Sequence, residues 1–263
     1  MTVQASRTRK GDDMDRLREK NALVIGGSTG IGREVCKLFA AEGANVAVAD
    51  FGHDADKSSL LAELEPLGGR SLAIEVDVTE EKQVAAGIAT AIDRFGQIDI
   101  LVNNAGIGGK HQPLLEETTA HYDRMMAVTL RGVWLGMKYV LPHMLARGTG
   151  RIINTASQLA HKPSPLNASY CAAKAGVVAL TASTALELAE TEIRVNAVCP
   201  GATDTPMWRA GDPAWCKWKT ESLPIKRVAQ PVEIAWAYVY LASDEASYMI
   251  GQSISPNGGD VGW

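Results

Sequence analysis

Apolar, strand-like runs alternate with helical patterns along nearly the whole chain. The apolar runs fall at residues 21–26, 44–50, 70–77, 98–103, 151–156, 193–199 and 253–256. The helical patterns fall near 32–42, 57–66, 80–95, 121–147, 167–189 and 232–242, and residues 200–226 form an irregular loop. Strands that alternate with helices form a parallel sheet covered on both faces. The sequence therefore predicts one α/β domain over residues 21–263, with a doubly wound, mostly parallel, seven-stranded sheet.

The segment before the first strand is polar, and we expect a flexible leader over residues 1–20. It contains no apolar run of signal-peptide length, and no later run is long and apolar enough to cross a membrane. The four cysteines and five histidines show no ligand-like spacing, so we expect reduced thiols, no metal site and a cytoplasmic protein. A formal net charge of −4 argues against a nucleic-acid partner.

A glycine-rich turn directly follows the first strand, with the sequence Gly26-Gly27-Ser28-Thr29-Gly30-Ile31-Gly32. Such a turn lets backbone amides approach a pyrophosphate at the positive end of the next helix. The spacing is G-x-x-x-G-x-G, which differs from the G-x-G-x-x-G of the longer dehydrogenases. A flexible turn without a ligand is the alternative, but glycines this dense at a strand-to-helix junction favour dinucleotide binding.

Asp50 ends the second strand and is followed by Phe51. A carboxylate at this place can accept both ribose hydroxyls of adenosine and repels a 2′-phosphate. Neither Thr29 nor Phe51 is a cation that offsets the repulsion, so we predict NAD(H) in preference to NADP(H). Two alternatives stay open: Arg33 can turn toward a phosphate, and Asp50 can be a solvated loop residue.

Polar and small residues also end the third and fourth strands. Asp77, followed by Val78, can place a carboxylate against the adenine amine, and Asn104-Ala105-Gly106 lets the chain pass close to the adenosine and ribose. Each is an ordinary strand-ending residue when taken singly. Together they lie at the carboxyl ends of parallel strands, where open α/β sheets bind their ligands.

Three residues indicate chemistry on an alcohol or a carbonyl. Ser157 follows the fifth strand, and Tyr170 and Lys174 lie four apart, on one face of the next helix. An ammonium near a phenol favours the phenolate, so we expect Lys174 to lower the pKa of Tyr170 toward neutrality. Such a phenol can exchange a proton with an alcohol oxygen that the Ser157 hydroxyl holds. The tyrosine–lysine spacing alone is more often a half-buried tyrosine beside a solvated lysine.

In this order and at these spacings, the motifs resemble those of the short-chain dehydrogenase/reductase family over residues 21–263. The motifs are the glycine turn, Asp77, Asn103 to Gly106, Ser157, Tyr170 with Lys174, Pro200-Gly201 and Asn257-Gly258-Gly259. The resemblance implies a Rossmann fold in which Tyr170 is the catalytic acid/base, Ser157 binds the substrate oxygen and Lys174 binds the nicotinamide ribose. It also implies a nicotinamide end lined by Pro200, Gly201, Thr203 and Thr205.

Two positions depart from the usual pattern of this family. Ile25 replaces a threonine whose hydroxyl helps to fix the glycine turn. Thr129 replaces an asparagine that holds a water in a proton relay leading from the lysine. A hydroxyl on a shorter side chain has no carboxamide to offer, so the relay is either rerouted or slowed. We keep Thr129 as a candidate catalytic residue.

The substrate end is expected in a lid that the resemblance places at about residues 204–227. The residues expected to edge the pocket are Ser157, Gln158, Leu166, Met207 and Trp208. Trp215 and Trp218 line either the pocket or a subunit interface. Tryptophan offers a large, rigid apolar surface, so we predict an apolar or aromatic substrate.

These residues favour an NAD-dependent dehydrogenase or reductase that acts on a secondary alcohol or ketone. One alternative is a 3-oxoacyl-thioester reductase that takes its substrate from an acyl carrier protein. A basic patch for that partner can come from Lys217, Lys219, Lys226 and Arg227. The other alternative is a catalytically silent dinucleotide sensor, but retention of the three reactive side chains argues against it.

The two long helices carry more apolar residues than one buried face needs. The surplus consists of Trp134, Met137, Val177, Val178 and Leu180. A surplus apolar face usually marks a subunit interface. The resemblance implies that these helices pair in a homotetramer.

Overall fold

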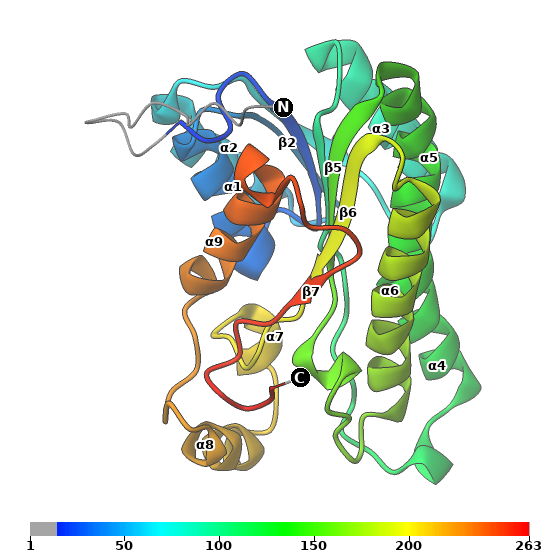
Figure 1. Cartoon of the computed structure of the whole chain (residues 1–263). Coiled ribbons are helices and arrows are strands. Elements are labelled where there is room, and N and C mark those ends of the chain that lie inside the picture. Colours follow the sequence, from blue (N-terminus) through cyan, green and yellow to red (C-terminus); the bar gives the residue numbers. More distant parts are fainter. Residues whose placement is uncertain (1–14, 263) are drawn as a thin grey trace, which may run out of the picture.

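Seven parallel strands form one sheet in the order β3-β2-β1-β4-β5-β6-β7 (Figure 1). The structure is a computed structural model that describes residues 15–262. The chain enters at the centre of the sheet, winds to one edge, returns, and winds to the other edge, as expected of a doubly wound fold. The strands are β1 (Asn21–Ile25), β2 (Asn45–Asp50), β3 (Ser71–Glu75), β4 (Ile100–Asn103), β5 (Thr149–Thr155), β6 (Glu192–Val198) and β7 (Ser253–Ile254).

Helices cover both faces of the sheet (Figure 1). One face carries α1 (Gly30–Ala41), α2 (Asp54–Leu64) and α9 (Pro231–Ala242), and the other carries α3 (Glu81–Phe95), α5 (Gly132–Arg147) and α6 (Ala168–Glu187). Successive residues of a strand point to opposite faces. Leu23 and Ala47 therefore lie in the core under α3, α5 and α6, while Val24 and Val48 lie in the core under α1 and α9. The expected α/β architecture is confirmed.

The expected irregular loop over residues 200–226 is wrong over residues 206–222. It contains two helices, α7 (Pro206–Arg209) and α8 (Pro213–Ser222). The side chain of Thr205 accepts a hydrogen bond from the amide of the third helical residue of α7, and that of Asp212 does the same for α8. Each cap is followed by a proline at the first helical position, where its missing N–H is harmless. The two cap–proline pairs are visible in the sequence.

The expected helix over residues 121–147 begins at α4 (Thr119–Met126) and continues into α5 through the π-helical turn Ala127–Arg131. Pro142 lies inside α5 and does not end it. Single π turns within α-helices are rare, and those that occur often lie at functional sites. The wide turn contains Thr129, one of the two positions that depart from the pattern of the family that the sequence resembles.

The expected flexible leader is wrong over residues 15–20. Leu17 is fully buried, and its amide donates to the carbonyl oxygen of Glu42 at 2.9 Å. Residues 1–14, the rest of the predicted leader, lie outside the described residues. Within residues 15–262 no helix has both the length and the apolar character that a membrane span requires.

The apolar surplus on the two long helices is smaller than expected. Met137 and Val177 belong to the core, because they face the sheet. Trp134 is exposed, and it borders a shallow apolar hollow together with Met126, Leu130 and Leu180. Two of the five predicted interface residues therefore have an interior role.

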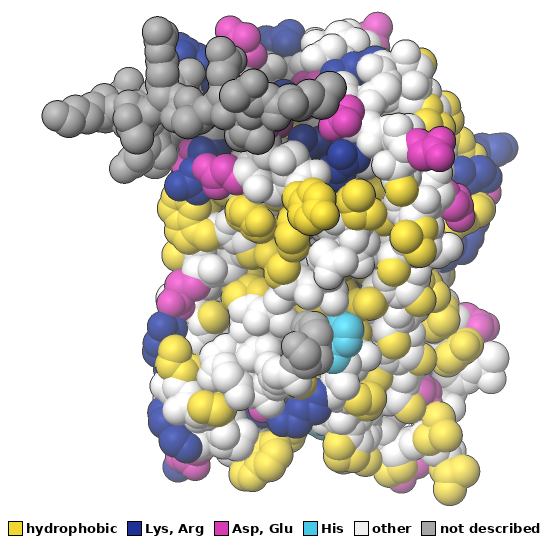
Figure 2. Space-filling view, viewed as in Figure 1, with side chains coloured by type: hydrophobic (Ala, Val, Ile, Leu, Met, Phe, Trp, Pro, Cys, Tyr) yellow, Lys and Arg dark blue, Asp and Glu magenta, His cyan; other side chains and the backbone are white. Residues whose placement is uncertain are grey.

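The expected basic patch near the lid is also smaller than the sequence suggests. Arg227 forms a bidentate pair with Glu233, at 2.7 Å for both contacts. Lys219 pairs with Asp260 at 2.6 Å, and Lys217 lies 3.9 Å from Glu221. Figure 2 shows cationic and anionic side chains interspersed around α8. The cations of this region are largely neutralised by their neighbours.

Candidate active site

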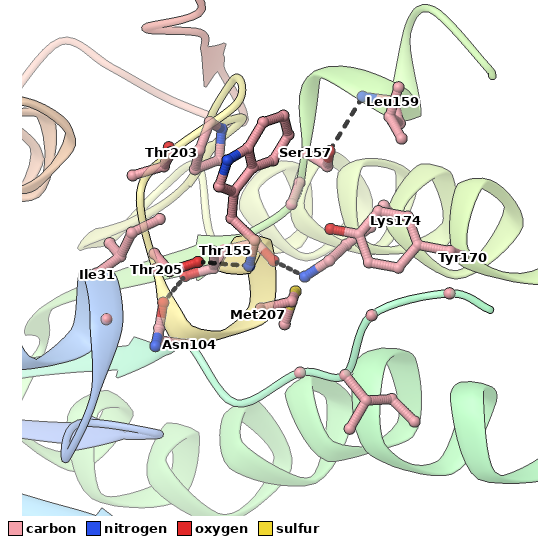
Figure 3. Close-up of a pocket in the computed structure, with 18 of the residues that line it drawn as sticks. Ile31, Asn104, Thr155, Ser157, Leu159, Tyr170, Lys174, Thr203, Thr205 and Met207 are labelled. Carbon is pink, nitrogen blue, oxygen red and sulfur yellow. Dashed lines mark hydrogen bonds between the residues drawn. The ribbon is translucent and has the colours of Figure 1, made fainter. Parts of the chain in front are cut away.

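A cavity of about 830 Å³ opens at the carboxyl ends of the strands, where a doubly wound sheet binds its ligands. It brings together residues predicted for the cofactor and residues predicted for the substrate (Figure 3). The predicted residues that line it are Gly26, Thr29, Gly30, Ile31, Asp50, Phe51, Asp77, Val78, Asn104, Ala105, Gly106, Ser157, Gln158, Tyr170, Lys174, Pro200, Gly201, Thr203, Thr205, Met207 and Trp208. Trp215 and Trp218, which were left open between pocket and interface, line it too.

Four predicted site residues do not line this cavity. Ser28 is fully buried beneath the glycine turn, and Gly32 packs against the carbonyl of Gly26. Thr129 is fully buried in the π turn. Leu166 has a left-handed φ of 65° and a side chain that is 46% exposed, so its expected place at the pocket edge is corrected to the surface.

The glycines of the turn are required by close backbone approach. A Cβ on Gly26, whose φ is 79°, would overlap the backbone of Ala105, and a Cβ on Gly32 would overlap the carbonyl of Gly26. Thr29, at the start of α1, makes no side-chain cap, so the first amides of the helix lie beside the cavity with no acceptor among the described residues. A positive helix end behind a turn with no room for a side chain at Gly26 and Gly32 fits the pyrophosphate of a dinucleotide.

Asp50 is held in place by the glycine turn. Its Oδ2 accepts hydrogen bonds from the amide and the hydroxyl of Ser28, and its Oδ1 accepts from the amide of Phe51 at 3.0 Å. Arg33 donates to the carbonyl of Ser28 at 3.2 Å and forms an ion pair with Glu63 at 2.6 Å. The guanidinium of Arg33 is therefore bound to α2, while the carboxylate of Asp50 borders the cavity.

The three reactive side chains converge from the segment after β5 and from α6 (Figure 3). The Oγ of Ser157 accepts a hydrogen bond from the amide of Leu159 at 3.1 Å, which leaves the hydroxyl proton free to be donated. The Nζ of Lys174 donates to the carbonyl oxygen of Thr155 at 2.7 Å and lies 5.9 Å from the ring centroid of Tyr170. Tyr170 and Ser157 thus border the same space, with the lysine beneath the ring.

The expected acidic phenol is not what the structure shows. Burial raises the pKa of Tyr170 above its ordinary value of 10.0, and its hydrogen bond with Ser157 offsets this only in part. Burial also lowers the pKa of Lys174 to about 8, because a charged ammonium is disfavoured away from water. The lysine donates a hydrogen bond to the carbonyl of Thr155, and it makes none to the phenol. Tyr170 is therefore protonated at neutral pH and ready to donate.

Thr129 lies close to the reactive side chains without a direct bond to them. Its hydroxyl donates to the sulfur of Met125 at 3.4 Å and accepts from the amide of Ile107 at 3.5 Å. A Cβ built on Gly106 would lie 3.6 Å from Lys174 Nζ and 3.9 Å from Thr129 Oγ1. The space in front of Gly106 thus separates the threonine hydroxyl from the lysine.

His111 forms part of the substrate end and was missed by the sequence analysis. Its ring lies 4.3 Å from the ring of Trp215, which in turn lies 5.5 Å from that of Trp208. His111 Nε2 lies 3.0 Å from the side-chain amide nitrogen of Asn167. Burial lowers the pKa of His111, so the ring is neutral at pH 7. A single histidine in a loop belongs to no spaced motif, so the sequence gives no sign of its role.

Asp260 is the second residue that the sequence did not indicate. Its carboxylate accepts hydrogen bonds from Gln158 Nε2 and Lys219 Nζ, both at 2.6 Å, and from Lys162 Nζ at 3.2 Å. It thereby ties α8 and the chain end to the residue that follows Ser157. Only the tertiary fold brings these three segments together, because they lie far apart in the sequence.

Comparisons with known proteins identify relatives of this chain. A family model described as enoyl-(acyl carrier protein) reductase matches residues 26–260. A cis-4-hydroxycyclohexanecarboxylate dehydrogenase of Sinomonas cyclohexanicum is 42% identical over 246 residues, 93% of this chain and 98% of that protein. A 3-oxoacyl-acyl-carrier-protein reductase of Thermotoga maritima is 36% identical over 246 residues, 94% of this chain and 99% of that protein. The crystal structure of a levodione reductase superposes with a TM-score of 0.89 at 35% identity, and covers 92% of this chain and 98% of that one.

Proposed function

The chain belongs to the short-chain dehydrogenase/reductase family of oxidoreductases, and from this premise we propose that it transfers a hydride between NAD(H) and a cyclic secondary alcohol or ketone. The observation that carries the proposal is the convergence of Ser157, Tyr170 and Lys174 on one cavity. The opposite end of that cavity is the glycine turn. Relatives with the same fold act on alcohols and ketones.

In this mechanism Ser157 and Tyr170 handle the substrate oxygen. When bound, a nicotinamide dinucleotide supplies or takes the hydride. The Ser157 hydroxyl donates a hydrogen bond to the carbonyl oxygen of a ketone and orients it toward the phenol. Tyr170, protonated at neutral pH, gives its proton to the same oxygen as the alcohol forms. Lys174 holds its place beneath the ring through the carbonyl of Thr155, and it would bind the nicotinamide ribose of a bound dinucleotide.

The preference for NAD(H) rests on the charges around Asp50. Its carboxylate borders the cavity, and a 2′-phosphate placed there meets a like charge. The nearest arginine, Arg33, is paired with Glu63 and bound to two carbonyl groups. No cation is therefore left on this side of the turn, among the residues described, to offset the repulsion.

The substrate class rests on the walls of the other end. Trp208, Trp215 and Trp218 line it together with Met207 and His111, so the space offers flat apolar surfaces. One relative, a hydroxycyclohexanecarboxylate dehydrogenase, acts by its name on a cyclohexane ring. A ring-bearing secondary alcohol suits both observations.

A 3-oxoacyl-thioester reductase is the second candidate, and the relative from Thermotoga maritima favours it. The paired cations around α8 weaken it, because they leave little basic surface for an acidic carrier protein. A silent sensor is the weakest candidate, because the reactive side chains are all in place.

We also infer a homotetramer and a reducing, cytoplasmic setting. The apolar hollow beside Trp134 lies on the two long helices and suits a second copy of the chain. All four cysteines are free thiols, and three of them are buried. Light scattering tests the assembly, since a monomeric mass contradicts it.

The proposed activity is tested by mixing the protein with NAD or NADP and a panel of cyclic, linear and polyhydroxy alcohols. Reduced nicotinamide is followed by absorbance. We expect turnover of cyclic secondary alcohols with NAD, and at least about 10-fold less with NADP, because of the charge on Asp50. Asp50→Asn should bring the rates with NAD and NADP closer together, and the rate with NADP should not fall. Faster turnover of polyols than of ring alcohols contradicts the substrate class, and no turnover of any alcohol contradicts the activity.

A further inference from the structure

A chain of buried polar groups runs from α9 to the glycine turn. The hydroxyl of Tyr238, a fully buried residue of α9, lies 2.7 Å from Thr155 Oγ1 at the end of β5. Thr155 Oγ1 lies 3.2 Å from Asn104 Oδ1, and Asn104 Nδ2 lies 2.7 Å from the carbonyl oxygen of Gly26. The chain therefore connects the carboxyl ends of β5, β4 and β1.

The carbonyl oxygen of Gly26, the last acceptor, determines the direction of every hydrogen bond in this chain of polar groups. The carbonyl of Gly26 only accepts, so the amide nitrogen of Asn104 faces it and the amide oxygen faces Thr155. That oxygen also only accepts, so Thr155 gives its one hydroxyl proton to it. Tyr238 must then donate to Thr155 Oγ1. The four groups have a single polarity, which ends at the turn.

Thr155 also connects this chain to the reactive lysine. Its hydroxyl belongs to the chain, and its carbonyl oxygen accepts the hydrogen bond from Lys174 Nζ at 2.7 Å. A rotation of the Thr155 side chain or a shift of its backbone would therefore be felt both at Lys174 and at the glycine turn. Tyr238 lies on the far side of Thr155 from the cavity and is not among its lining residues.

We propose that Tyr238 is a positioning residue for the dinucleotide site, acting through the hydroxyl of Thr155. It locks the side chain of Thr155, which holds Asn104 against the carbonyl of Gly26 and so fixes the turn from behind. Ile25 offers no hydroxyl for this purpose, although the family usually has one at that position. The inference rests on the proposed function, because the turn is taken to bind NAD(H).

The decisive variant is Tyr238→Phe, which removes one oxygen and keeps the ring in the core. We expect NADH, titrated by its fluorescence, to bind about 3- to 10-fold more weakly, which is the size of effect that one neutral hydrogen bond produces. Thr155→Val should weaken binding at least as much, while Thr155→Ser, which keeps the hydroxyl, should restore it. Tyr240→Phe is the matched control, because Tyr240 is on the same helix and its hydroxyl bonds to no described residue.

A double variant separates positioning from general stability. If Tyr238 acts through Thr155, Tyr238→Phe/Thr155→Val binds NADH no more weakly than Thr155→Val alone. Additive losses, or a lower Tm for Tyr238→Phe with unchanged NADH affinity, overturn the proposal and leave Tyr238 as a packing residue. If the wild-type protein binds no NADH at all, the proposed function is contradicted. Failure of the proposed function is therefore distinguishable from failure of the positioning role of Tyr238.

Discussion

The two ends of the cavity are built in different ways. The cofactor end is made by residues at the carboxyl ends of adjacent strands, and its side chains are bound to the neighbouring backbone, as Asp50 is to Ser28 and Asn104 to Gly26. The substrate end is made by segments that are distant in the sequence, and its aromatic and charged side chains contact one another. His111 touches Trp215 there, and Asp260 joins α8 to the loop after Ser157.

This difference implies different tolerance to change. The cofactor end is fixed by strand register and by glycines that leave no room for a side chain, so small changes there should be severe. The substrate end consists of large side chains around open space, so it can change its specificity without loss of the fold. The predictions below test this contrast.

Gly32→Ala should have the largest effect on the cofactor end. The added Cβ would overlap the carbonyl of Gly26, and backbone atoms must shift to relieve it. We expect about 3 kcal/mol less stability to denaturant and no measurable NADH binding. Gly262→Ala is the control, because nothing lies within 4 Å of the new methyl group. Normal NADH affinity in Gly32→Ala would show that this end is not rigid.

Trp215→Ala should change the substrate end alone. The ring of Trp215 contacts those of His111 and Trp208, so its loss removes the centre of the aromatic wall. We expect KM for a cyclic ketone to rise about 10-fold with NADH affinity unchanged. Trp218→Ala, at a ring that is 61% exposed, should raise KM only about 2-fold. Equal effects of the two variants, or weaker NADH binding, would contradict the separation of the two ends.

The pH dependence of ketone reduction tests Lys174, which lies between the two ends. Its pKa of about 8 means that it is charged below that pH and loses its charge above it. If the reaction needs the ammonium, kcat/KM falls as the pH rises past about 8. Lys174→Arg keeps its charge to higher pH and should move the fall in the alkaline direction. A fall at the same pH in both proteins would assign it to another group.

Thr129 should contribute little to turnover. Its hydroxyl is bound to Met125 and Ile107 and not to Lys174, so Thr129→Val should lower kcat only about 3-fold. Thr129→Asn provides the comparison, since it introduces the residue that the family usually has at this position. If turnover across pH is the same in both variants and in wild type, Thr129 is a packing residue. A large loss in Thr129→Val alone would show that the relay passes through its hydroxyl.

Sequence reasoning was most successful where local rules determine the structure. The order of strands and helices, the turn from Gly26 to Gly32 and the place of Asp50 follow from periodicity, glycine content and strand ends. It failed where contacts between distant segments decide. Burial in the fold, which no spacing reveals, raises the pKa of Tyr170 in place of the expected fall. His111 and Asp260 were not predicted as site residues either, because their partners come from other segments. The helices over residues 206–222 were missed although their caps and prolines were visible.

The central claim is that the phenol of Tyr170 transfers the proton at the substrate oxygen. The most direct measurement is ketone reduction by Tyr170→Phe, in protein whose NADH affinity is shown by fluorescence to match that of wild type. The account predicts a rate lower by about 100- to 10,000-fold, the contribution of a positioned acid. An undiminished rate with normal NADH binding would contradict it.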